Sequence, residues 1–227
     1  MLVQYAFNIK GCKQDDLFNQ FRGVISEERE KKLDKFHFEA DRLRSLYAEI
    51  LLRYGLQKEG MRSEDIQFVH NEYGKPGLKD RKDLYFNLSH SGDWVICAIS
   101  SKPVGADVEQ VKNREMDIAE RFFSSYEYKE LMKCPKEAQA EYFCKLWTLK
   151  ESYVKALGMG LSKSFTSFWF EIHGGDIRMY TEENGHNDYY FYVYPLEPGY
   201  EAAICTKERY MGKYRPVTME DLKKALL

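Results

Sequence analysis

Apolar residues recur with helical spacing in two separate parts of the chain. The first part is residues 26–60, which begins at Ser26, a typical N-cap residue. The second part is residues 118–157, where a break is expected near Pro135. The apolar positions are Leu46, Ile50, Leu51 and Tyr54 in the first part and Phe143, Leu146, Leu149, Tyr153 and Leu157 in the second. Both parts are therefore predicted to form helices that bury one face.

Runs rich in aromatic and β-branched residues predict strands after each helical part. After the first, residues 66–78 and 83–101 have this composition, with a Gly/Pro turn between them, and "VGADVEQ" (104–110) continues the extended character. After the second come "SFWFEIHG", "YYFYVYPL" and "YEAAICTK". The chain thus has the same order of elements twice, a helical part followed by strands.

The two repeats also resemble each other in sequence. "DWVICAISS" resembles "GYEAAICTK", and "EILLRYGL" resembles "SYVKALGM", at a spacing of about 105 residues. These matches are short and apolar, so chance similarity between like elements is the alternative. We predict an α+β fold of two similar halves, residues 1–102 and 103–227, that pack tightly and form a cleft between them.

Composition and charge narrow the possible classes of protein. A net charge of −2 gives no basis for binding nucleic acid or a membrane surface by bulk electrostatics. No segment approaches the roughly 20 apolar residues that span a bilayer, and the N-terminus lacks the pattern of a signal peptide. The five cysteines are an odd number without a CxxC pair, which is typical of reduced thiols. We therefore expect a cytoplasmic protein whose partners include neither nucleic acid nor a membrane.

The segment "VGADVEQ" carries the first candidate chemistry. Side chains alternate along a strand, so its apolar residues would face the core, while Asp107 and Glu109 would share the opposite face with Gly105. A solvated strand face is the alternative. Glu151, on the second helical part, would complete an all-oxygen site, and such ligands favour Mg²⁺ or Mn²⁺ over zinc or copper.

The second helical part has a lysine on its apolar side. Lys150 lies among the apolar positions, where an unpaired charge would cost too much free energy, so a polar or acidic partner is expected. Glu151 and Lys155 lie four residues apart on one flank, before Gly158 ends the helix. An exposed ion pair is the alternative for these two residues, and it would stabilise the helix by only about 0.2–0.5 kcal/mol.

Two further segments offer ligands for phosphate. Lys75 lies in the Gly/Pro turn "YGKP", and we expect its ammonium group to reach outward from that turn. Ser89, His90 and Ser91 follow a strand-like run and precede a glycine, and small polar residues with a histidine suit anion binding. An ordinary hairpin turn is the alternative for the second segment.

Four motifs in order, "YGKP", "FNLSHSGDW", "VGADVE" and "LWTLKESYVKALGMGL", resemble the 4′-phosphopantetheinyl transferases of the surfactin-synthetase-activating (Sfp) type. The resemblance extends over nearly the whole chain. Ala106 departs from the Ile or Val usual in the family, which is expected to affect packing rather than chemistry. The resemblance implies halves related by a pseudo-twofold axis, each a small antiparallel sheet packed with a long helix, with coenzyme A bound between them.

The activity implied by this resemblance is a Mg²⁺-dependent transfer. The 4′-phosphopantetheine arm of coenzyme A passes to a serine of an acyl or peptidyl carrier protein, and adenosine 3′,5′-bisphosphate is released. By matching motif positions, the resemblance implies Mg²⁺ ligands at Asp107, Glu109 and Glu151, phosphate contacts from Lys75, Ser89, His90 and Lys155, an adenine contact at the backbone of Tyr73, and a 3′-phosphate site at Arg29, Lys32, Arg44 and Ser45. The catalytic residues are expected to be Glu151 and Lys155.

In the implied reaction, Glu151 takes the proton of the attacking serine, either directly or through a water on the metal ion. Lys155 neutralises the leaving phosphate. The carrier protein is expected to dock on residues 112–128, through exposed apolar side chains and complementary charge. The residues involved would be Lys112, Arg114 and Arg121 with Met116, Ile118 and Phe122 or Phe123, although at least one of the two phenylalanines is expected in the core. An internal duplication removes the need to dimerise, so a monomer is expected.

Two other classes of function share parts of this pattern. Another Mg²⁺-dependent phosphotransferase or hydrolase, acting on a nucleotide diphosphate, would use the same acids and lysines without a carrier protein. A non-catalytic module would bind a nucleotide or coenzyme A without turnover. For a transferase, the carrier proteins of peptide, polyketide (antibiotic) and fatty acid synthesis are all candidate substrates.

Overall fold

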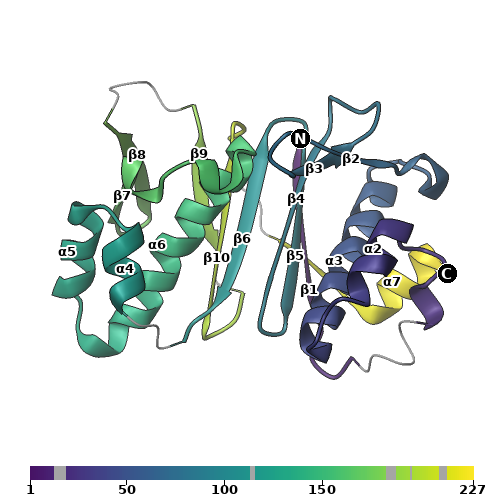
Figure 1. Ribbon diagram of the computed structural model, residues 1–227, viewed down its shortest axis with the longest axis horizontal. Helices are drawn as coiled ribbons and strands as arrows, with labels where there is room; N and C mark the ends of the chain where they lie inside the picture. Colours follow the sequence, from purple (N-terminus) through teal and green to yellow (C-terminus); the bar gives the residue numbers. More distant parts are fainter. Residues whose placement is uncertain (13–18, 113–115, 183–187, 195, 210–213) are drawn as a thin grey trace.

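Two sheets lie next to each other at the centre of the protein (Figure 1). The computed structural model describes residues 1–227 except 13–18, 113–115, 183–187, 195 and 210–213. A long helix covers the outer side of each sheet, α3 (Glu39–Lys58) in one half and α6 (Lys136–Leu157) in the other (Figure 1). The predicted α+β fold of two halves, each a small sheet packed with a long helix, is confirmed.

The first half is built on a four-stranded sheet with the order β11-β1-β5-β4. Strand β5 pairs antiparallel with both β1 and β4, and β11 pairs parallel with β1. The strands are β1 (Leu2–Asn8), β4 (Tyr85–Ser91), β5 (Trp94–Ser100) and β11 (Arg215–Val217), with a separate hairpin of β2 (Phe68–His70) and β3 (Pro76–Leu78). The helices are α2 (Glu27–Leu33), α3 and α7 (Met219–Leu226), with a 3-10 turn at Ser63–Asp65.

The second half is built on a three-stranded antiparallel sheet with the order β6-β10-β9. The strands are β6 (Val104–Gln110), β9 (Tyr190–Tyr194) and β10 (Tyr200–Thr206), with a separate hairpin of β7 (Phe168–His173) and β8 (Asp176–Thr181). The helices are α4 (Met116–Phe122), α5 (Ser125–Lys133) and α6, with 3-10 turns at Gly160–Ser162 and Phe165–Ser167. Both halves thus use the same combination of sheet and long helix.

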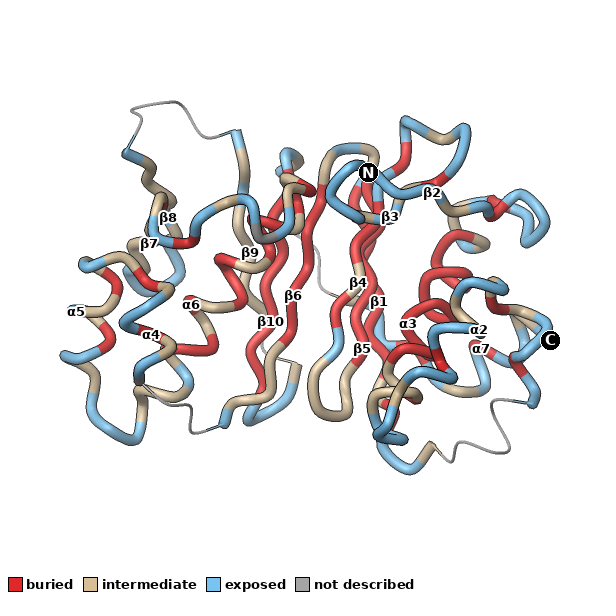
Figure 2. Tube along the Cα trace, viewed as in Figure 1, coloured by how far each residue is buried: buried red, intermediate tan, exposed pale blue. Residues whose placement is uncertain are grey.

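Three apolar clusters hold the layers together. One joins α3 to the sheet of the first half, and a second joins α6 to β10 and the β7–β8 hairpin. The third lies between the two sheets and includes Ala98, Ala106 and Ile204. Figure 2 shows that burial is concentrated in the central strands and in the two long helices. The halves therefore meet across a continuous apolar interface, as expected from the absence of a low-complexity linker between them in the sequence.

The predicted helical parts are present, with additional breaks. Residues 26–60 form α2 and α3, and the hydroxyl of Ser26 caps α2 by accepting a hydrogen bond from the Arg29 amide (3.2 Å). The break expected near Pro135 is confirmed between α5 and α6. A second break precedes α5, because Ser124 and Glu127 form a capping box that starts a new helix there.

The last segment of the chain belongs to the first half. Strand β11 pairs with β1, and Val217 and Leu222 are buried in the core beneath α3. The expected division at residues 102/103 assigned all of 103–227 to the second half, so this segment departs from it. Strands β1, β8 and β11 and helix α7 were not predicted. Strand β1 is buried along most of its length and so lacks the alternation of a half-buried strand, β11 has three residues, and both pair with strands distant in the sequence.

Two findings bear on the expectations drawn from composition. Within the described ranges, no helix is long and apolar enough to cross a membrane. The five cysteines are free thiols, and three of them, Cys97, Cys144 and Cys205, are buried. Burial raises the pKa of the Cys97 thiol, so this residue packs as a small apolar group.

Candidate active site

Helix α6 packs directly on strand β6 at Gly105. A Cβ atom at this position would lie 1.9 Å from the carbonyl oxygen of Ser152, far inside contact distance. Only a glycine permits the helix backbone to approach the strand this closely. The approach brings Glu151 and Lys155 of α6 next to Asp107 of β6.

Strand β6 has the alternation predicted from its sequence. The three apolar side chains, Val104, Ala106 and Val108, are almost fully buried, while Asp107 and Glu109 contact polar groups on the other face. Asp107 is itself only 3% exposed, so a solvated strand face does not describe this position. A carboxylate buried to this extent needs specific partners.

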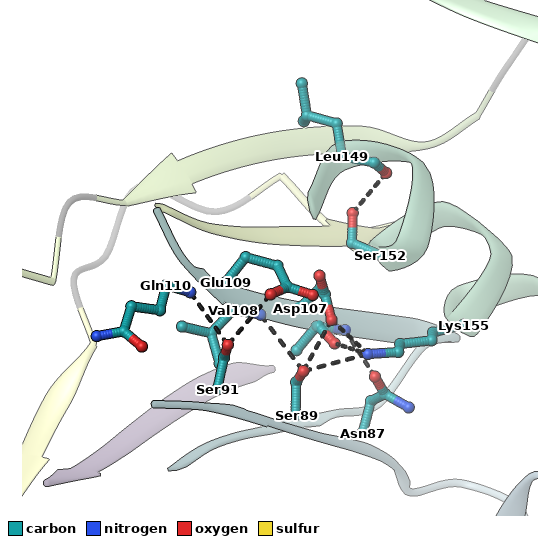
Figure 3. Close-up of polar contacts among 11 residues, drawn as sticks. Asn87, Ser89, Ser91, Asp107, Val108, Glu109, Gln110, Leu149, Ser152 and Lys155 are labelled. Carbon is teal, nitrogen blue, oxygen red and sulfur yellow. Dashed lines mark hydrogen bonds and ion pairs between the residues drawn. The ribbon is translucent and has the colours of Figure 1, made fainter. Parts of the chain in front are cut away.

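Asp107 lies at the centre of a hydrogen-bonded cluster (Figure 3). Its Oδ1 atom pairs with Nζ of Lys155 at 2.5 Å and accepts a hydrogen bond from the Ser89 hydroxyl at 2.8 Å. Lys155 also donates to Oγ of Ser89 (3.2 Å) and to the carbonyl oxygen of Ala106 (3.3 Å). Burial opposes the charged ammonium, but Asp107 and Glu151 outweigh it and raise the pKa of Lys155. Lys155 is thus a cation bound within the site rather than a solvated partner of Glu151.

Two neighbouring carboxylates affect the protonation of Glu151. Burial raises the pKa of Glu151; the charge of Lys155 counteracts this effect, and Asp107 and Glu109 reinforce it. Glu109 accepts a hydrogen bond from the Ser91 hydroxyl at 3.1 Å. A carboxylate with a raised pKa is a stronger base, which suits Glu151 for accepting a proton near neutral pH.

The three acids predicted to bind Mg²⁺ are brought together without the geometry of a metal site. Among the described residues, no group of three or more His, Cys, Asp or Glu side chains is arranged to hold a metal ion. The ammonium of Lys155 instead supplies the positive charge next to Asp107. The Oδ2 atom of Asp107 is nevertheless buried without a hydrogen-bond partner in the described structure. An unpaired buried carboxylate oxygen among oxygen donors fits a hard cation chemically.

Positive charges converge on His90. The ring is exposed to solvent, yet desolvation by its neighbours and the charges of Arg44, Lys155 and Arg29 lower its pKa to about 4. The three cations come from α3, α6 and α2, and Arg44 is held by a hydrogen bond to the carbonyl oxygen of Gly92 (3.0 Å). His90 is therefore neutral at pH 7, and its surroundings suit a bound anion.

A cavity of about 160 Å³ lies between α2, α3 and the β2–β3 hairpin. Two of the predicted cationic residues, Arg29 and Lys32, line it, and burial together with the charge of Arg29 lowers the pKa of Lys32. Arg29 donates to Oγ of Ser45 (2.9 Å) and pairs with Glu49 (3.2 Å). Ser45 is almost fully buried, and its hydroxyl oxygen accepts this hydrogen bond from Arg29.

The ammonium group of Lys75 points inward, which contradicts the expectation that it reaches outward from its turn. It donates to the carbonyl oxygens of Val104 (3.1 Å), Lys155 and Ala156. The last carbonyl groups of a helix carry partial negative charge, and they attract a cation. Burial lowers the pKa of Lys75 to about 8. Lys75 thus ties the β2–β3 hairpin to the end of α6 and the start of β6.

Asn71 fastens the same turn and was not identified from the sequence. Its side-chain oxygen accepts the amides of Tyr73 (3.0 Å) and Lys75 (2.8 Å), and its Nδ2 atom donates to the carbonyl oxygen of Gly158 (2.9 Å). The backbone at Tyr73 is therefore fixed, while the Tyr73 side chain is exposed. An asparagine just before a Tyr-Gly turn is a typical Asx-turn residue, which is the sequence signal for this role.

Lys150 is fully buried, as its place on the apolar side of the helix predicted. Its ammonium pairs with Glu127 of α5 at 2.8 Å and donates to the carbonyl oxygens of Phe165 and Phe168. Burial lowers the pKa of Lys150 to about 8, although the charge of Glu127 counteracts this. The expected polar or acidic partner is confirmed, and the pair fixes α6 against α5 and the start of β7.

The segment expected to dock a carrier protein, residues 112–128, is partly core. Phe123 is 3% exposed and packs against Phe143, so the expectation that one of the two phenylalanines is core is confirmed. Phe122 is half-buried and lies edge-on to Trp147. Lys112 and Arg121 are exposed, Ile118 is half-buried, and Arg114 and the side chain of Met116 lie outside the described residues.

The polar residues of β4 form part of the site as well. Ser89, His90 and Ser91 lie within this strand and not after it, so an ordinary hairpin turn does not account for them. Asn87 and Ser91 contact β6; Asn87 was not named from the sequence, and Ser91 was named only within the segment suited to anion binding. Their signal in the sequence is a small polar residue at every second position of the strand, at Asn87, Ser89 and Ser91.

Two family profiles match consecutive parts of the chain. The profile of the 4′-phosphopantetheinyl transferase superfamily matches residues 103–205, and the N-terminal profile of 4′-phosphopantetheinyl transferases matches residues 13–102. Both halves of the chain therefore carry the sequence pattern of one class of enzyme, the 4′-phosphopantetheinyl transferases.

Two relatives of known activity give the same result. The chain is 38% identical to 4′-phosphopantetheinyl transferase Sfp of Bacillus subtilis over 82% of its own length and 84% of the relative's. It is 37% identical to 4′-phosphopantetheinyl transferase gsp of Aneurinibacillus migulanus over 84% and 79%. A crystal structure of holo-[acyl-carrier-protein] synthase from Thermotoga maritima matches 47% of this chain and 64% of its own, with 24% identity and a TM-score of 0.40. The chain belongs to the 4′-phosphopantetheinyl transferase family and is of the Sfp type.

Proposed function

We propose that this chain transfers the 4′-phosphopantetheine arm of coenzyme A to a serine of an acyl or peptidyl carrier protein, with adenosine 3′,5′-bisphosphate as the other product. Membership of the family supports the reaction. The main structural support is that three carboxylates and Lys155 lie close to the cations around His90. A pyrophosphate ester needs cations for its phosphates and a base for the attacking hydroxyl.

The nucleotide part of coenzyme A is proposed to lie along the first half. Its adenine would meet the fixed backbone at Tyr73, and its 3′-phosphate would lie near the cavity lined by Arg29 and Lys32. Further phosphate contacts are proposed from Arg44, Ser89, His90 and Lys155, and Ser45 would act by orienting Arg29. Lys75 would have to leave three carbonyl oxygens to reach a phosphate, so we propose that it orders the hairpin instead.

The chemistry is proposed to begin at Glu151. Its carboxylate takes the proton of the carrier serine as the serine oxygen attacks the β-phosphorus of coenzyme A. The bond from that phosphorus to the bridging oxygen breaks, and the bisphosphate leaves with the electron pair. Lys155 neutralises the charge that grows on the leaving group. The raised pKa of Glu151 and the charged state of Lys155 both support these roles.

A Mg²⁺ ion, or Mn²⁺ in its place, is proposed at Asp107, Glu109 and Glu151. The buried and unpaired Oδ2 atom of Asp107 and the all-oxygen donor set support this assignment. When bound, such an ion offsets negative charge on the two phosphates. Lys155 would then exchange its ion pair with Asp107 for one with a phosphate oxygen.

The carrier protein is proposed to dock on residues 112–128, where Lys112 and Arg121 are exposed. Their charge would complement an acidic helix of the carrier, and the half-buried Ile118 and Phe122 would add apolar contact. Carriers of peptide, polyketide and fatty acid synthesis are the candidate substrates. A monomeric state and a cytoplasmic location stay predictions.

The reaction is tested by mass spectrometry of an apo carrier protein incubated with the enzyme, coenzyme A and Mg²⁺. The carrier should gain the mass of one phosphopantetheine arm. The variant Asp107→Ala should keep the fold and lose this transfer, because it removes a carboxylate from the polar face of β6. Turnover of coenzyme A or a nucleotide diphosphate with the carrier left unmodified would instead indicate a different phosphotransferase or hydrolase.

Binding of coenzyme A should be coupled to proton uptake by His90. A phosphate next to His90 would raise the pKa of its imidazole from about 4 toward the ordinary value. The resulting gain in affinity is present in full below about pH 4 and is lost as the pH rises toward about 6.5. Calorimetry near about pH 5, in two buffers of different ionisation enthalpy, measures the protons taken up. His90→Asn is the control, since it removes the imidazole and leaves the titration of the ligand's phosphates and of the site carboxylates unchanged. Equal proton uptake by both proteins would show that His90 does not contact the bound phosphate.

Charge reversal in the docking segment should affect the carrier and not coenzyme A. Replacing Lys112 and Arg121 by glutamate is expected to raise KM for the carrier by about tenfold, because rim charges steer encounter and register. KM for coenzyme A should change by less than about twofold. Steady-state kinetics with each substrate varied in turn measures both constants. A parallel rise in both would indicate that the segment shapes the active site itself.

A further inference from the structure

Strand β6 has two edges, and only one pairs with another strand of its sheet. That edge pairs antiparallel with β10, with Ala106 opposite Ile204. Backbone groups alternate between the two edges of a strand, so every second residue of β6 presents its amide to the other edge. The other edge faces β4, which belongs to the sheet of the first half.

On the edge of β6 that faces β4, the backbone amides form hydrogen bonds with side chains and not with the backbone of a second strand (Figure 3). Three backbone amides of β6 donate hydrogen bonds to side chains of β4. The Ala106 amide donates to Oδ1 of Asn87 (2.8 Å), the Val108 amide to Oγ of Ser89 (3.3 Å) and the Gln110 amide to Oγ of Ser91 (3.1 Å). Two carbonyl oxygens on this edge, those of Val104 and Ala106, accept from Lys75 and Lys155. We call the contacts of Asn87, Ser89 and Ser91 with β6 the seam. The seam joins the halves at the strand that carries the acids.

Two serines of the seam also donate to those acids. Ser89 donates to Asp107, and Ser91 donates to Oε2 of Glu109 at 3.1 Å. A serine hydroxyl has one proton and two lone pairs. The Ser91 hydroxyl therefore donates a hydrogen bond to Glu109 and accepts one from the backbone amide of Gln110. This exchange fixes the Glu109 carboxylate relative to the backbone of its own strand.

The position of Ser91 is itself fixed from the second half. Ser91 is the last residue of β4, and the turn after it contains Gly92 at φ +55°. A Cβ atom at Gly92 would lie 2.2 Å from the hydroxyl oxygen of Tyr200 on β10, and this hydroxyl accepts the amide of Asp93 at 3.0 Å. Tyr200 lies opposite Gln110 in the β6–β10 ladder. The turn, Ser91 and β6 are thus held together as one unit.

We propose that Ser91 is a positioning residue that holds the carboxylate of Glu109 in place from across the seam, an assignment that rests on the metal-binding role of Glu109 proposed above. Without the Ser91 hydroxyl, the Glu109 side chain gains rotational freedom, which must be lost again whenever it binds a cation. Removing a residue that orients a metal ligand typically lowers metal affinity by about 10- to 100-fold. Asn87 differs from Ser91, since in the seam its oxygen accepts only a backbone amide.

The test compares Ser91→Ala with Asn87→Ala and with Ser91→Thr, which keeps the hydroxyl. Ser91→Ala should raise the Mg²⁺ concentration for half-maximal transfer by about tenfold and weaken Mn²⁺ binding to the complex with coenzyme A similarly, as measured by electron paramagnetic resonance. Its kcat at saturating Mg²⁺ should stay within about twofold of wild type. Asn87→Ala should lower the melting temperature without shifting the Mg²⁺ requirement. Ser91→Thr, which keeps the hydroxyl, should have the Mg²⁺ requirement of the wild type. Equal Mg²⁺ requirements in Ser91→Ala and wild type would overturn the role of Ser91.

A double-mutant cycle separates this outcome from a failure of the proposed metal site. Ser91→Ala and Glu109→Ala, which removes the acceptor of the Ser91 hydroxyl, are compared singly and together by thermal unfolding without divalent ions. Contact between the two side chains predicts that the losses in melting temperature are less than additive. Additive losses would overturn the positioning of Glu109 by Ser91. A wild-type enzyme that transfers without any divalent ion would instead overturn the metal site, and the cycle would then decide the role of Ser91 by itself.

Discussion

Replacing Glu151 by glutamine should lower kcat for transfer by about 10²- to 10⁴-fold, the usual range for loss of a general acid or base. Glutamine keeps the shape of the side chain and one metal-capable oxygen but cannot accept a proton at neutral pH. Affinity for coenzyme A should therefore fall only modestly. Single-turnover kinetics with saturating coenzyme A, together with calorimetric titration, separates the chemical step from binding.

Lys155→Ala is the matched comparison, because Lys155 lies one turn along α6 and pairs with Asp107. This change should weaken coenzyme A binding and also slow the chemical step, since a phosphate contact and the charge that balances the leaving group are lost together. It also leaves the buried Asp107 carboxylate without its cation, so a lower melting temperature is expected. Near-normal turnover in Glu151→Gln would show that another base takes the proton of the carrier serine. Glu151 would then act only as a ligand of the metal ion.

Replacing Gly105 by alanine should displace the catalytic helix. The added Cβ atom would collide with the backbone of Ser152, which cannot move without moving α6. Overpacking of this kind costs about 1–3 kcal/mol or more, and for a chain of this size each kcal/mol lowers the melting temperature by about 2–4 °C. A shift of about 1 Å between Glu151 and Asp107 should lower kcat/KM by about 10²-fold. Differential scanning calorimetry and steady-state kinetics measure the two effects.

Gly175→Ala provides the control for this substitution. Gly175 lies in the turn between β7 and β8, and an added Cβ atom there would have no neighbour within 4 Å among the described residues. Its melting temperature and kcat/KM should stay close to wild type, so that a large effect at Gly105 reports contact with α6 and not the loss of a glycine in general. Equal behaviour of the two variants would show that α6 adjusts freely to the strand.

Local sequence was sufficient to predict the components of the site. The alternation in "VGADVEQ" predicted that Asp107 and Glu109 share one face, and the structure has their apolar neighbours buried on the other. The helical period predicted that Lys150 is buried with a polar or acidic partner, and its pair with Glu127 confirms this. These predictions succeed because a period of two or of about 3.6 residues is fixed by backbone geometry alone.

The sequence also determined the class of protein. Four short motifs in one order identified the family, and the profile matches and the relatives at 37–38% identity confirm it. The order of elements predicted two α+β halves, although strands β1, β8 and β11 were missed. Strand β11 has three residues and β1 is buried along most of its length, so neither has the alternation that identifies a half-buried strand.

Only the tertiary structure decided which distant residues meet. Lys75 was expected to reach outward from a turn, but the end of α6 lies above that turn and offers carbonyl oxygens to its ammonium. The chain end returns to the first half because β1 has an open edge for β11. The seam arises in the same way, since Asn87, Ser89 and Ser91 become partners of β6 only when the two sheets are placed side by side. Hydrogen bonds between residues far apart in sequence depend on packing, and no local period encodes them.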